Sequence, residues 1–341
     1  MTRLLLAWLL LPLAACAAPP GARAGTADPC AVEAVHTTFL QVWNRDLARR
    51  PADWYRLFST LAELGIDEVI LQWTRYGHTA FYHGRGDLLG PVLEAAQRHN
   101  LRVVVGLQYD PRFWRAIDKQ PEALARYLRE RARTVAAQVG ELARYIHARR
   151  LAAMVSGWYI ADELDDETWL EPQKARALTT YLRTVVQAVR HSGLDRPVAV
   201  SGFSNGRTAP ARSAALWHDL LRESGADLFL FQDGIGAGKL TLAALPAHLA
   251  ALDAEFSGTD RQFRVVTELF RQQKGEAGRF EAQPAPYNRI LRQLDLATRH
   301  GTRRPVAFSV PDYLLGEQPD RRALREQWQA ALTRCRLALI Q

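Results

Sequence analysis

The stretch GWYIADELDD, residues 157–166, follows a short apolar run at 151–155 and precedes a long helical pattern. An apolar run bounded in this way is typical of a buried strand that ends in a loop. Four carboxylates lie in that expected loop, beside two large aromatic side chains. The acidic residues 165–167 suit a second role, which is to cap and solvate the following helix. For Glu163 we favour a functional role, because a carboxylate at the C-terminal tip of a barrel strand is well placed for catalysis.

Outward from this stretch, the same unit recurs from Glu33 onward: a short apolar or β-branched run, a polar or aromatic tip, and an amphipathic helix. Strands are expected at 35–42, 68–72, 103–107, 153–159, 197–200, 227–231, 263–267 and 306–310. Helices are expected at 52–64, 88–99, 122–149, 173–191, 212–223, 242–256, 287–300 and 321–339. Eight such units, spaced by roughly 35 residues, predict one α/β domain with the (β/α)8 fold, a TIM barrel. Helix ends are expected to place four glycines in the left-handed conformation: Gly65, Gly193, Gly225 and Gly301.

Composition supports a folded chain of this size. Of 341 residues, 48% are hydrophobic and 23% are charged, which allows a substantial core and gives no case for disorder. The net charge of +8 comes largely from arginines scattered along helical stretches, which is typical of solvated helix faces. No nucleic-acid-binding motif accompanies them, so nucleic acid is not an expected partner, although a weak preference for polyanionic substrates remains open.

The N-terminus has the pattern of a bacterial lipoprotein signal peptide. Arg3 supplies a positive charge, residues 4–13 are apolar, and the run is too short to span a membrane. Residues 13–16, LAAC, resemble a lipobox, so residues 1–15 are predicted to be removed and Cys16 to be lipidated; an ordinary signal peptide is the alternative. Residues 16–30 then form a flexible tether, and 31–341 the barrel. Ala17 after the cysteine favours, by analogy, export to the periplasmic face of the outer membrane of a Gram-negative bacterium, with membrane contact through the lipid only.

Two further cysteines, Cys30 and Cys335, precede the first strand and lie in the last helix. A closed barrel brings its first and last units together, and the exported setting is oxidising, so a disulfide is expected. It would enclose 335 − 30 = 305 residues, for which the chain-entropy model allows up to roughly 5 kcal/mol. The alternative is a pair of buried free thiols.

The strand tips of a barrel converge on one face, and here they are rich in aromatic rings, amides and carboxylates. Sugars offer apolar C–H faces and hydroxyl edges, so a carbohydrate site combines ring platforms with hydrogen-bonding side chains. We therefore expect a poly- or oligosaccharide site. The predicted substrate-binding residues are Gln41, Trp43, Gln72, Trp73, Tyr109, Trp158, Asp162, Asn205, Gln232, Asp233, Asp312 and Tyr313.

Two glutamates of this ring, Glu163 and Glu268, are the predicted catalytic pair. Glycoside hydrolysis needs one protonated and one ionised carboxyl group on either side of the scissile bond. We expect Glu163 to act as acid/base, with its pKa raised by Trp158, Tyr159 and the second carboxylate, and Glu268 to act as an ionised nucleophile. In the alternative, Glu268 forms a buried ion pair with an arginine such as Arg271.

Several blocks carry a resemblance to a known family: residues 38–43 (TFLQVW), 70–74 (ILQWT), 157–160 (GWYI) with Glu163, and 232–236 (QDGIG). They resemble a bacterial domain-of-unknown-function family, the 4434 type, of glycosidase-like barrels, over essentially 35–310. Glutamates after strands four and seven also resemble the retaining TIM-barrel glycoside hydrolases, which implies a carbohydrate link. Members of that clan carry Asn before the strand-four Glu, to hold the sugar 2-hydroxyl, whereas this chain carries Asp162.

Other chemistries find less support in the sequence. His36, His78, His83 and His99 lack the clustering of metal ligands, and no metal or cofactor is expected. The glycine-rich run 234–238 lacks the context of a phosphate loop, and 201–206 lacks the first Gly of a nucleophile elbow. Asp110 at a strand end is open to sugar binding or helix capping.

Three functions are therefore open. The first is a membrane-tethered glycoside hydrolase-like enzyme acting on an envelope or extracellular polysaccharide. The second is a catalytically inactive polysaccharide-binding lipoprotein of an exopolysaccharide assembly or secretion system. The third is a structural lipoprotein without affinity for sugar.

Overall fold

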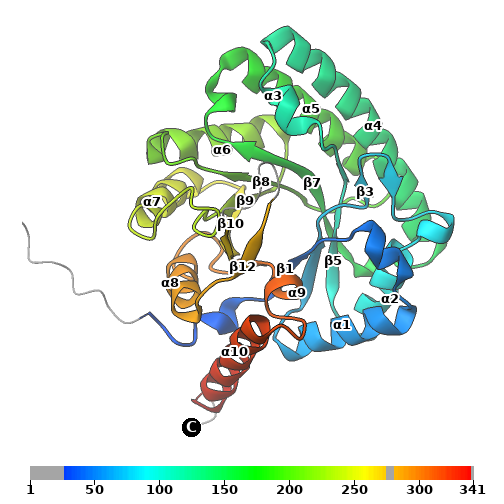
Figure 1. Cartoon of the computed structure of the whole chain (residues 1–341). Coiled ribbons are helices and arrows are strands. Elements are labelled where there is room, and N and C mark those ends of the chain that lie inside the picture. The colour runs from blue at the N-terminus through cyan, green and yellow to red at the C-terminus, as the bar shows by residue number, and fades with distance from the viewer. Residues whose placement is uncertain (1–26, 274–279, 339–341) are drawn as a thin grey trace, which may run out of the picture.

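The computed structural model describes residues 27–273 and 280–338, and it forms a barrel of parallel strands inside a ring of helices (Figure 1). Eight strands close the barrel in the order β1-β13-β10-β9-β8-β7-β5-β2, with β1 pairing both β2 and β13. The TIM-barrel prediction is confirmed. The barrel strands are β1 (Thr37–Leu40), β2 (Glu68–Leu71), β5 (Arg102–Gly106), β7 (Val155–Asp165), β8 (Val198–Phe203), β9 (Leu228–Gln232), β10 (Gln262–Glu268) and β13 (Val306–Phe308).

The helices on the outside bury one apolar face each against these strands, as their sequence period of about 3.6 residues requires. Several begin with Pro at the first helical position, where the missing N–H costs no intrahelical bond. The four predicted glycines lie at positive φ: 89° at Gly65, 77° at Gly193, 81° at Gly225 and 56° at Gly301. The outer helices are α1 (Pro51–Glu63), α2 (Leu89–Arg98), α4 (Pro121–Ala148), α5 (Pro172–Arg190), α6 (Pro210–Ser224), α7 (Leu245–Phe256), α8 (Tyr287–Ala297) and α10 (Pro319–Ala338).

Strand β7 departs from the expected boundaries. It continues to Asp165, so Asp162, Glu163 and Asp165 lie within the strand and not in the predicted loop. Its register against β8 shifts between Ile160, which pairs with Val200, and Glu163, which pairs with Ser201. A bulge inserts residues into one strand and re-aims the side chains that follow. This bulge turns Glu163 toward the barrel mouth and Asp162 away from it.

Short additional elements decorate the C-terminal end of the barrel. After β2 and β5, the strands β3 (Arg75–Tyr76), β4 (Thr79–Ala80) and β6 (Gln108–Tyr109) form a small sheet, and β11 (Phe270–Gln272) pairs with β12 (Ala282–Pro284) after β10. Two short helices, α3 (Phe113–Ile117) and α9 (Val310–Tyr313), complete this end. Each of these elements has only two to five residues, which is too few to show a periodic pattern of apolar residues in the sequence.

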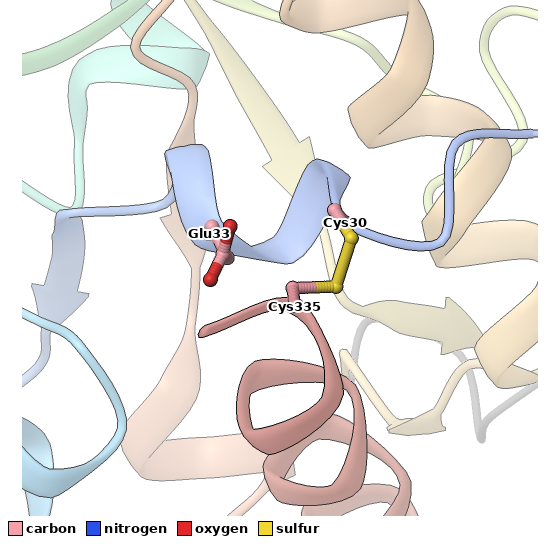
Figure 2. Close-up of side chains that lie close together, drawn as sticks. All are labelled: Cys30, Glu33 and Cys335. Carbon is pink, nitrogen blue, oxygen red and sulfur yellow. A yellow bond between two sulfur atoms is a disulfide. The ribbon is translucent and has the colours of Figure 1, made fainter. Parts of the chain in front are cut away.

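Cys30 and Cys335 form the predicted disulfide, with a Cα–Cα distance of 5.7 Å (Figure 2). It joins the turn before the 3-10 helix η1 (Ala31–Ala34) to the end of α10. Glu33 lies beside the two sulfurs, and within the described residues this trio is the grouping with metal-ligand geometry. Because both sulfurs are covalently paired, the trio offers no thiolate to a metal ion.

The predicted signal peptide, the lipidated Cys16 and most of the tether lie outside the described residues. Among the helices that are described, none combines the length and the apolar character needed to cross a membrane.

Candidate active site

A pocket of about 380 Å³ opens at the C-terminal end of the barrel. This is the end at which TIM barrels place their functional groups, because the segments after each strand meet there. The lining combines aromatic rings, amides, two carboxyl groups and one ammonium. Its residues are Gln41, Trp43, Gln72, Trp73, Tyr76, Tyr109, Glu163, Gln232, Ala237, Lys239, Val266, Glu268, Phe270, Gln272, Phe280, Phe308 and Tyr313.

Aromatic rings form two walls of this pocket. In the first wall, Trp73 lies 5.0 Å from Trp43, 5.2 Å from Tyr76 and 5.6 Å from Tyr109, between ring centroids. The Trp73 indole N–H donates to the Val42 carbonyl at 2.7 Å, which fixes the ring at the centre of the wall. Mutually packed rings hold their orientation at little entropic cost.

The second wall is built on Phe270. Its ring stacks on Tyr313 at 5.4 Å and contacts Phe280 at 5.4 Å and Phe308 at 6.1 Å. Phe280 is 57% exposed, an unusual fraction for a large apolar side chain, and it extends this wall to the pocket rim. Two such walls suit the apolar faces of a sugar ring.

The polar part of the pocket comes from amides at the strand ends. Gln41 Nε2 donates to Gln72 Oε1 at 2.7 Å, which joins the tips of β1 and β2. Gln232 Nε2 donates to Ser201 Oγ at 3.3 Å, and Ser201 is itself 2.7 Å from the Tyr159 hydroxyl. These bonds fix the amide groups and leave further lone pairs and N–H groups for a hydroxylated ligand.

Glu163 enters the pocket from β7 and is partly buried. Burial is the main cause that raises the pKa of its carboxyl group, and Asp162 adds to the rise, whereas Lys239 and Gln232 act against it. The direction agrees with the expectation for this residue, but the causes differ. Trp158 does not face the pocket: it is fully buried, and its indole N–H donates to the Leu194 carbonyl at 3.0 Å.

Glu268 ends β10, three strands away from β7 around the barrel, and is 5% exposed. Ala237 N–H donates to its Oε2 at 2.7 Å. Burial and the neighbouring carboxyl of Asp233 raise the pKa of Glu268 to about 8, against the opposing effects of the Ala237 and Gly236 N–H groups and Lys239. The expected donors are present, but they do not keep this carboxyl ionised at neutral pH. No ion pair joins it to Arg271 in the described part of the chain.

The family model described as "Domain of unknown function (DUF4434)" matches residues 35–323. The chain belongs to this family. A relative, "Uncharacterized protein YbcH" of Escherichia coli (strain K12), is 31% identical over 246 residues, which are 72% of this chain and 79% of the relative.

Two solved structures that are similar to this DUF4434 chain are described as glycosidases, a fucosidase and a galactosidase. A "putative alpha-L-fucosidase" from Bacteroides thetaiotaomicron VPI-5482 superposes with a TM-score of 0.71 at 18% identity, covering 88% of this chain and 93% of that one. A beta-galactosidase from the psychrophilic Marinomonas ef1 gives a TM-score of 0.52 at 12% identity, covering 89% of this chain and 60% of that one. At these identities the likeness shows a shared fold.

Of the substrate-binding residues predicted from the DUF4434 sequence, the structure brings seven to the pocket, together with both predicted catalytic glutamates: Gln41, Trp43, Gln72, Trp73, Tyr109, Gln232 and Tyr313. Five others lie outside the lining, and Trp158 is the first of them. The Asn205 backbone N–H donates a hydrogen bond to the Asp166 carboxylate at 3.2 Å, and the Asp312 carboxylate accepts one from the Ser309 hydroxyl.

Asp162 and Asp233, the remaining two, are buried behind the pocket. Asp162 forms an ion pair with Arg131 at 2.7 Å and accepts a hydrogen bond from the Tyr181 hydroxyl at 2.5 Å. It therefore does not take the place of the clan's sugar-binding Asn. Asp233 accepts hydrogen bonds from Gln293 Nε2 at 2.6 Å and from the Ile235 N–H at 3.1 Å, and it acts on the pocket through Glu268.

Lys239 is the most consequential residue that the sequence did not predict. It lies in the β9–α7 segment, just after the glycine-rich run 234–238 that has no phosphate-loop context. The run curves over Glu268: a Cβ on Gly236 would lie 2.4 Å from the Phe270 carbonyl oxygen and 2.9 Å from Glu268 Oε2. The glycine-rich run was thus a signal of close backbone approach to a buried carboxyl group.

Proposed function

We propose that the protein is a glycoside hydrolase-like enzyme that acts on an envelope or extracellular polysaccharide through the carboxyl groups of Glu163 and Glu268. The observation that supports this most directly is that both carboxyl groups, from β7 and β10, line one pocket between two aromatic walls. Hydrolysis of a glycosidic bond needs such a pair, one protonated and one ionised.

The electrostatics of the pocket favour a division of roles that differs from the expected one. Burial and Asp233 keep a proton on Glu268 up to a pH of about 8. Burial raises the pKa of Glu163 as well, but there Lys239 and Gln232 oppose the rise, whereas at Glu268 the neighbouring Asp233 adds to it. On this difference in neighbours we propose Glu268 as the general acid and Glu163, the glutamate favoured by Lys239 and Gln232, as the nucleophile or general base.

Glu163→Gln and Glu268→Gln test both the reaction and the roles. On unactivated oligosaccharides we expect either variant to lose about 100- to 10,000-fold in kcat. On aryl glycosides with a good leaving group, which needs no proton, the variant of the acid keeps most of its activity and the variant of the ionised partner does not. If Glu163→Gln is the variant that keeps its activity on aryl glycosides, then Glu163 is the acid and Glu268 the nucleophile, as expected from the sequence.

The second candidate, a binding lipoprotein without catalysis, would use the same aromatic walls. Two packed walls and paired amides need no carboxyl chemistry to hold a sugar. If the unmutated protein binds oligosaccharides on a glycan array and cleaves none of a broad panel, this candidate replaces the enzyme. An array without any binding would favour the structural lipoprotein.

We also propose lipid anchoring through Cys16 at the periplasmic face of the outer membrane. The proposal rests on the apolar run and the LAAC sequence, residues 13–16. In a Gram-negative host, the unmutated protein should fractionate with outer membranes, and Cys16→Ser should be found in the soluble periplasmic fraction. Soluble recovery of the unmutated protein would rule the anchor out.

A further inference from the structure

Lys239 places a positive charge in the pocket. The backbone conformation of the β9–α7 segment fixes the position of this residue. Gly234 and Gly238 lie at φ 65° and 69°, and the Lys239 N–H donates to the Gly234 carbonyl at 2.8 Å. The ammonium Nζ lies over the Phe203 ring, 2.8 Å from its centroid. A cation held on a ring face is oriented without being neutralised.

Among the residues that the structure describes, the charge of Lys239 has no partner at ion-pair distance. Within 4.0 Å of Nζ, the described residues offer no carboxylate, although Lys239 interacts at longer range with Glu163 and Glu268, and also with Asp165 and Asp166. Desolvation in the pocket lowers the pKa of Lys239 in spite of these carboxyl groups. A desolvated ammonium without a direct partner is costly, and an anionic group on a ligand would remove that cost.

Charge balance during the proposed reaction leads to the same ligand. The transition state of glycoside hydrolysis resembles an oxocarbenium ion, so positive charge develops on the sugar. Lys239 lines the same pocket as the two glutamates, so its ammonium group repels this developing positive charge. A negative charge on the substrate would offset that repulsion.

On the basis of the proposed function, we infer that the pocket receives a sugar unit that carries a carboxylate, a uronic acid residue, and that Lys239 binds this carboxylate. The net charge of +8 would favour encounter with an acidic polysaccharide. A carboxylate fits better than a phosphate, because phosphate sites commonly use arginine forks or several free backbone N–H groups. Here the Ala237 N–H is already bonded to Glu268, and Lys239 is the cationic side chain among the described lining residues.

The experiment compares uronate-containing oligosaccharides of several linkages with their carboxyl-reduced counterparts, which differ only in the acidic group. Dissociation constants are measured by calorimetry in a Glu268→Gln background that suppresses turnover, and rates are measured on the unmutated protein. Lys239→Met removes the charge with little change in volume, and Lys239→Arg keeps it. Lys119→Met, at an exposed position outside the pocket lining, is the matched control.

We expect the acidic probes to bind roughly 10- to 100-fold more tightly than the reduced ones, the usual range for a hydrogen bond to a charged group. Lys239→Met should reduce this preference to about twofold or less, Lys239→Arg should keep part of it, and Lys119→Met should keep all of it. Higher salt should weaken binding of the acidic probes only. Circular dichroism confirms that each variant is folded, and Lys239→Gln replaces Lys239→Met if that variant unfolds.

The outcomes separate this inference from the proposed function. If acidic and reduced probes bind equally and are cleaved in a Glu163- and Glu268-dependent way, the inference is wrong and the hydrolase stands. If a Lys239-dependent preference appears without cleavage, the uronate site stands and the hydrolase fails. Tighter binding of sulfated than of carboxylated oligosaccharides would overturn the choice of carboxylate, and absence of all saccharide binding would overturn both proposals.

Discussion

At the N-terminal end of the barrel Glu68 is surrounded by donors, whereas at the C-terminal end Glu268 lies beside a second carboxyl group. Glu68 Oε1 accepts from the Ser156 hydroxyl at 2.7 Å, and its Oε2 lies 3.1 Å from Arg264 and 3.2 Å from the Thr37 hydroxyl. Four different strands meet in this network. Glu268 accepts a hydrogen bond from the Ala237 N–H at 2.7 Å, but the neighbouring Asp233 raises its pKa.

This difference shows how the barrel separates stability from chemistry. The network around Glu68 pairs its charges within the protein, so it closes the barrel without needing a ligand. The groups at the other end are buried, but Lys239, Glu163 and Glu268 lack direct ion-pair partners among the described residues. These groups are therefore free to form direct contacts with a ligand that enters the pocket. Three predictions test this separation.

The largest expected effect on stability is at the N-terminal end. Replacing both Cys30 and Cys335 by Ser removes the link between the two ends of the chain, and we expect the free energy of unfolding to fall by about 3–5 kcal/mol. Denaturant unfolding at pH 7 measures this loss. Saccharide binding well below the unfolding transition should be unchanged, because the disulfide lies at the opposite end from the pocket. A loss under about 1 kcal/mol, or altered binding, would contradict the separation.

Glu268→Gln should stabilise the protein at high pH. The folded-state pKa is raised from 4.5 to about 8, so the contribution of this carboxyl to stability is complete below pH 4.5 and is lost as the pH rises toward 8. At a pH of about 8.5 the variant should be more stable than the unmutated protein by about 3–4 kcal/mol, and nearly equal to it at a pH of about 4.5.

Urea unfolding at both pH values measures this difference, and Glu63→Gln, at an exposed helical position, is the control that should show neither effect. Equal destabilisation of Glu268→Gln at both pH values would mean that the carboxyl is ionised and stabilising in the folded protein. The site would then resemble the network around Glu68.

Glu68→Gln should give the smallest effect, a loss of about 1–2 kcal/mol in the free energy of unfolding at pH 7. Arg264 loses its ionic partner, but the hydroxyl groups of Ser156 and Thr37 still have an amide oxygen to which they donate. The Glu68 and Arg264 side chains are about one-fifth exposed, at 18% and 20%, so solvent screens part of the interaction. Thermal unfolding measures the loss. Saccharide affinity should be unaffected, and a change in selectivity for acidic probes would show that the two ends are coupled.

Particular residues show which features of the pocket can be predicted from the sequence. The sequence predicts that Glu163 and Glu268 lie on one face, because each follows a β-rich run, and both do line the pocket. Asp162 is adjacent to Glu163 and equally polar, yet it pairs with Arg131, which lies 31 residues away on α4. No local pattern distinguishes these neighbours, because the bulge in β7 depends on pairing with β8. Lys239 was missed for a related reason: its direction depends on a turn packed against Phe203 and Glu268.

By itself the sequence determined the barrel, its helix ends and the Cys30–Cys335 pairing. These depend on periodicity, glycine placement and chain closure, which are all properties of residues near one another or of the repeat as a whole. The tertiary structure alone decided which acids face the pocket, how Asp233 raises the pKa of Glu268, and where the charge of Lys239 lies. The physical reason is that desolvation and Coulomb interactions act across space, between groups that the chain brings together only after the barrel has closed.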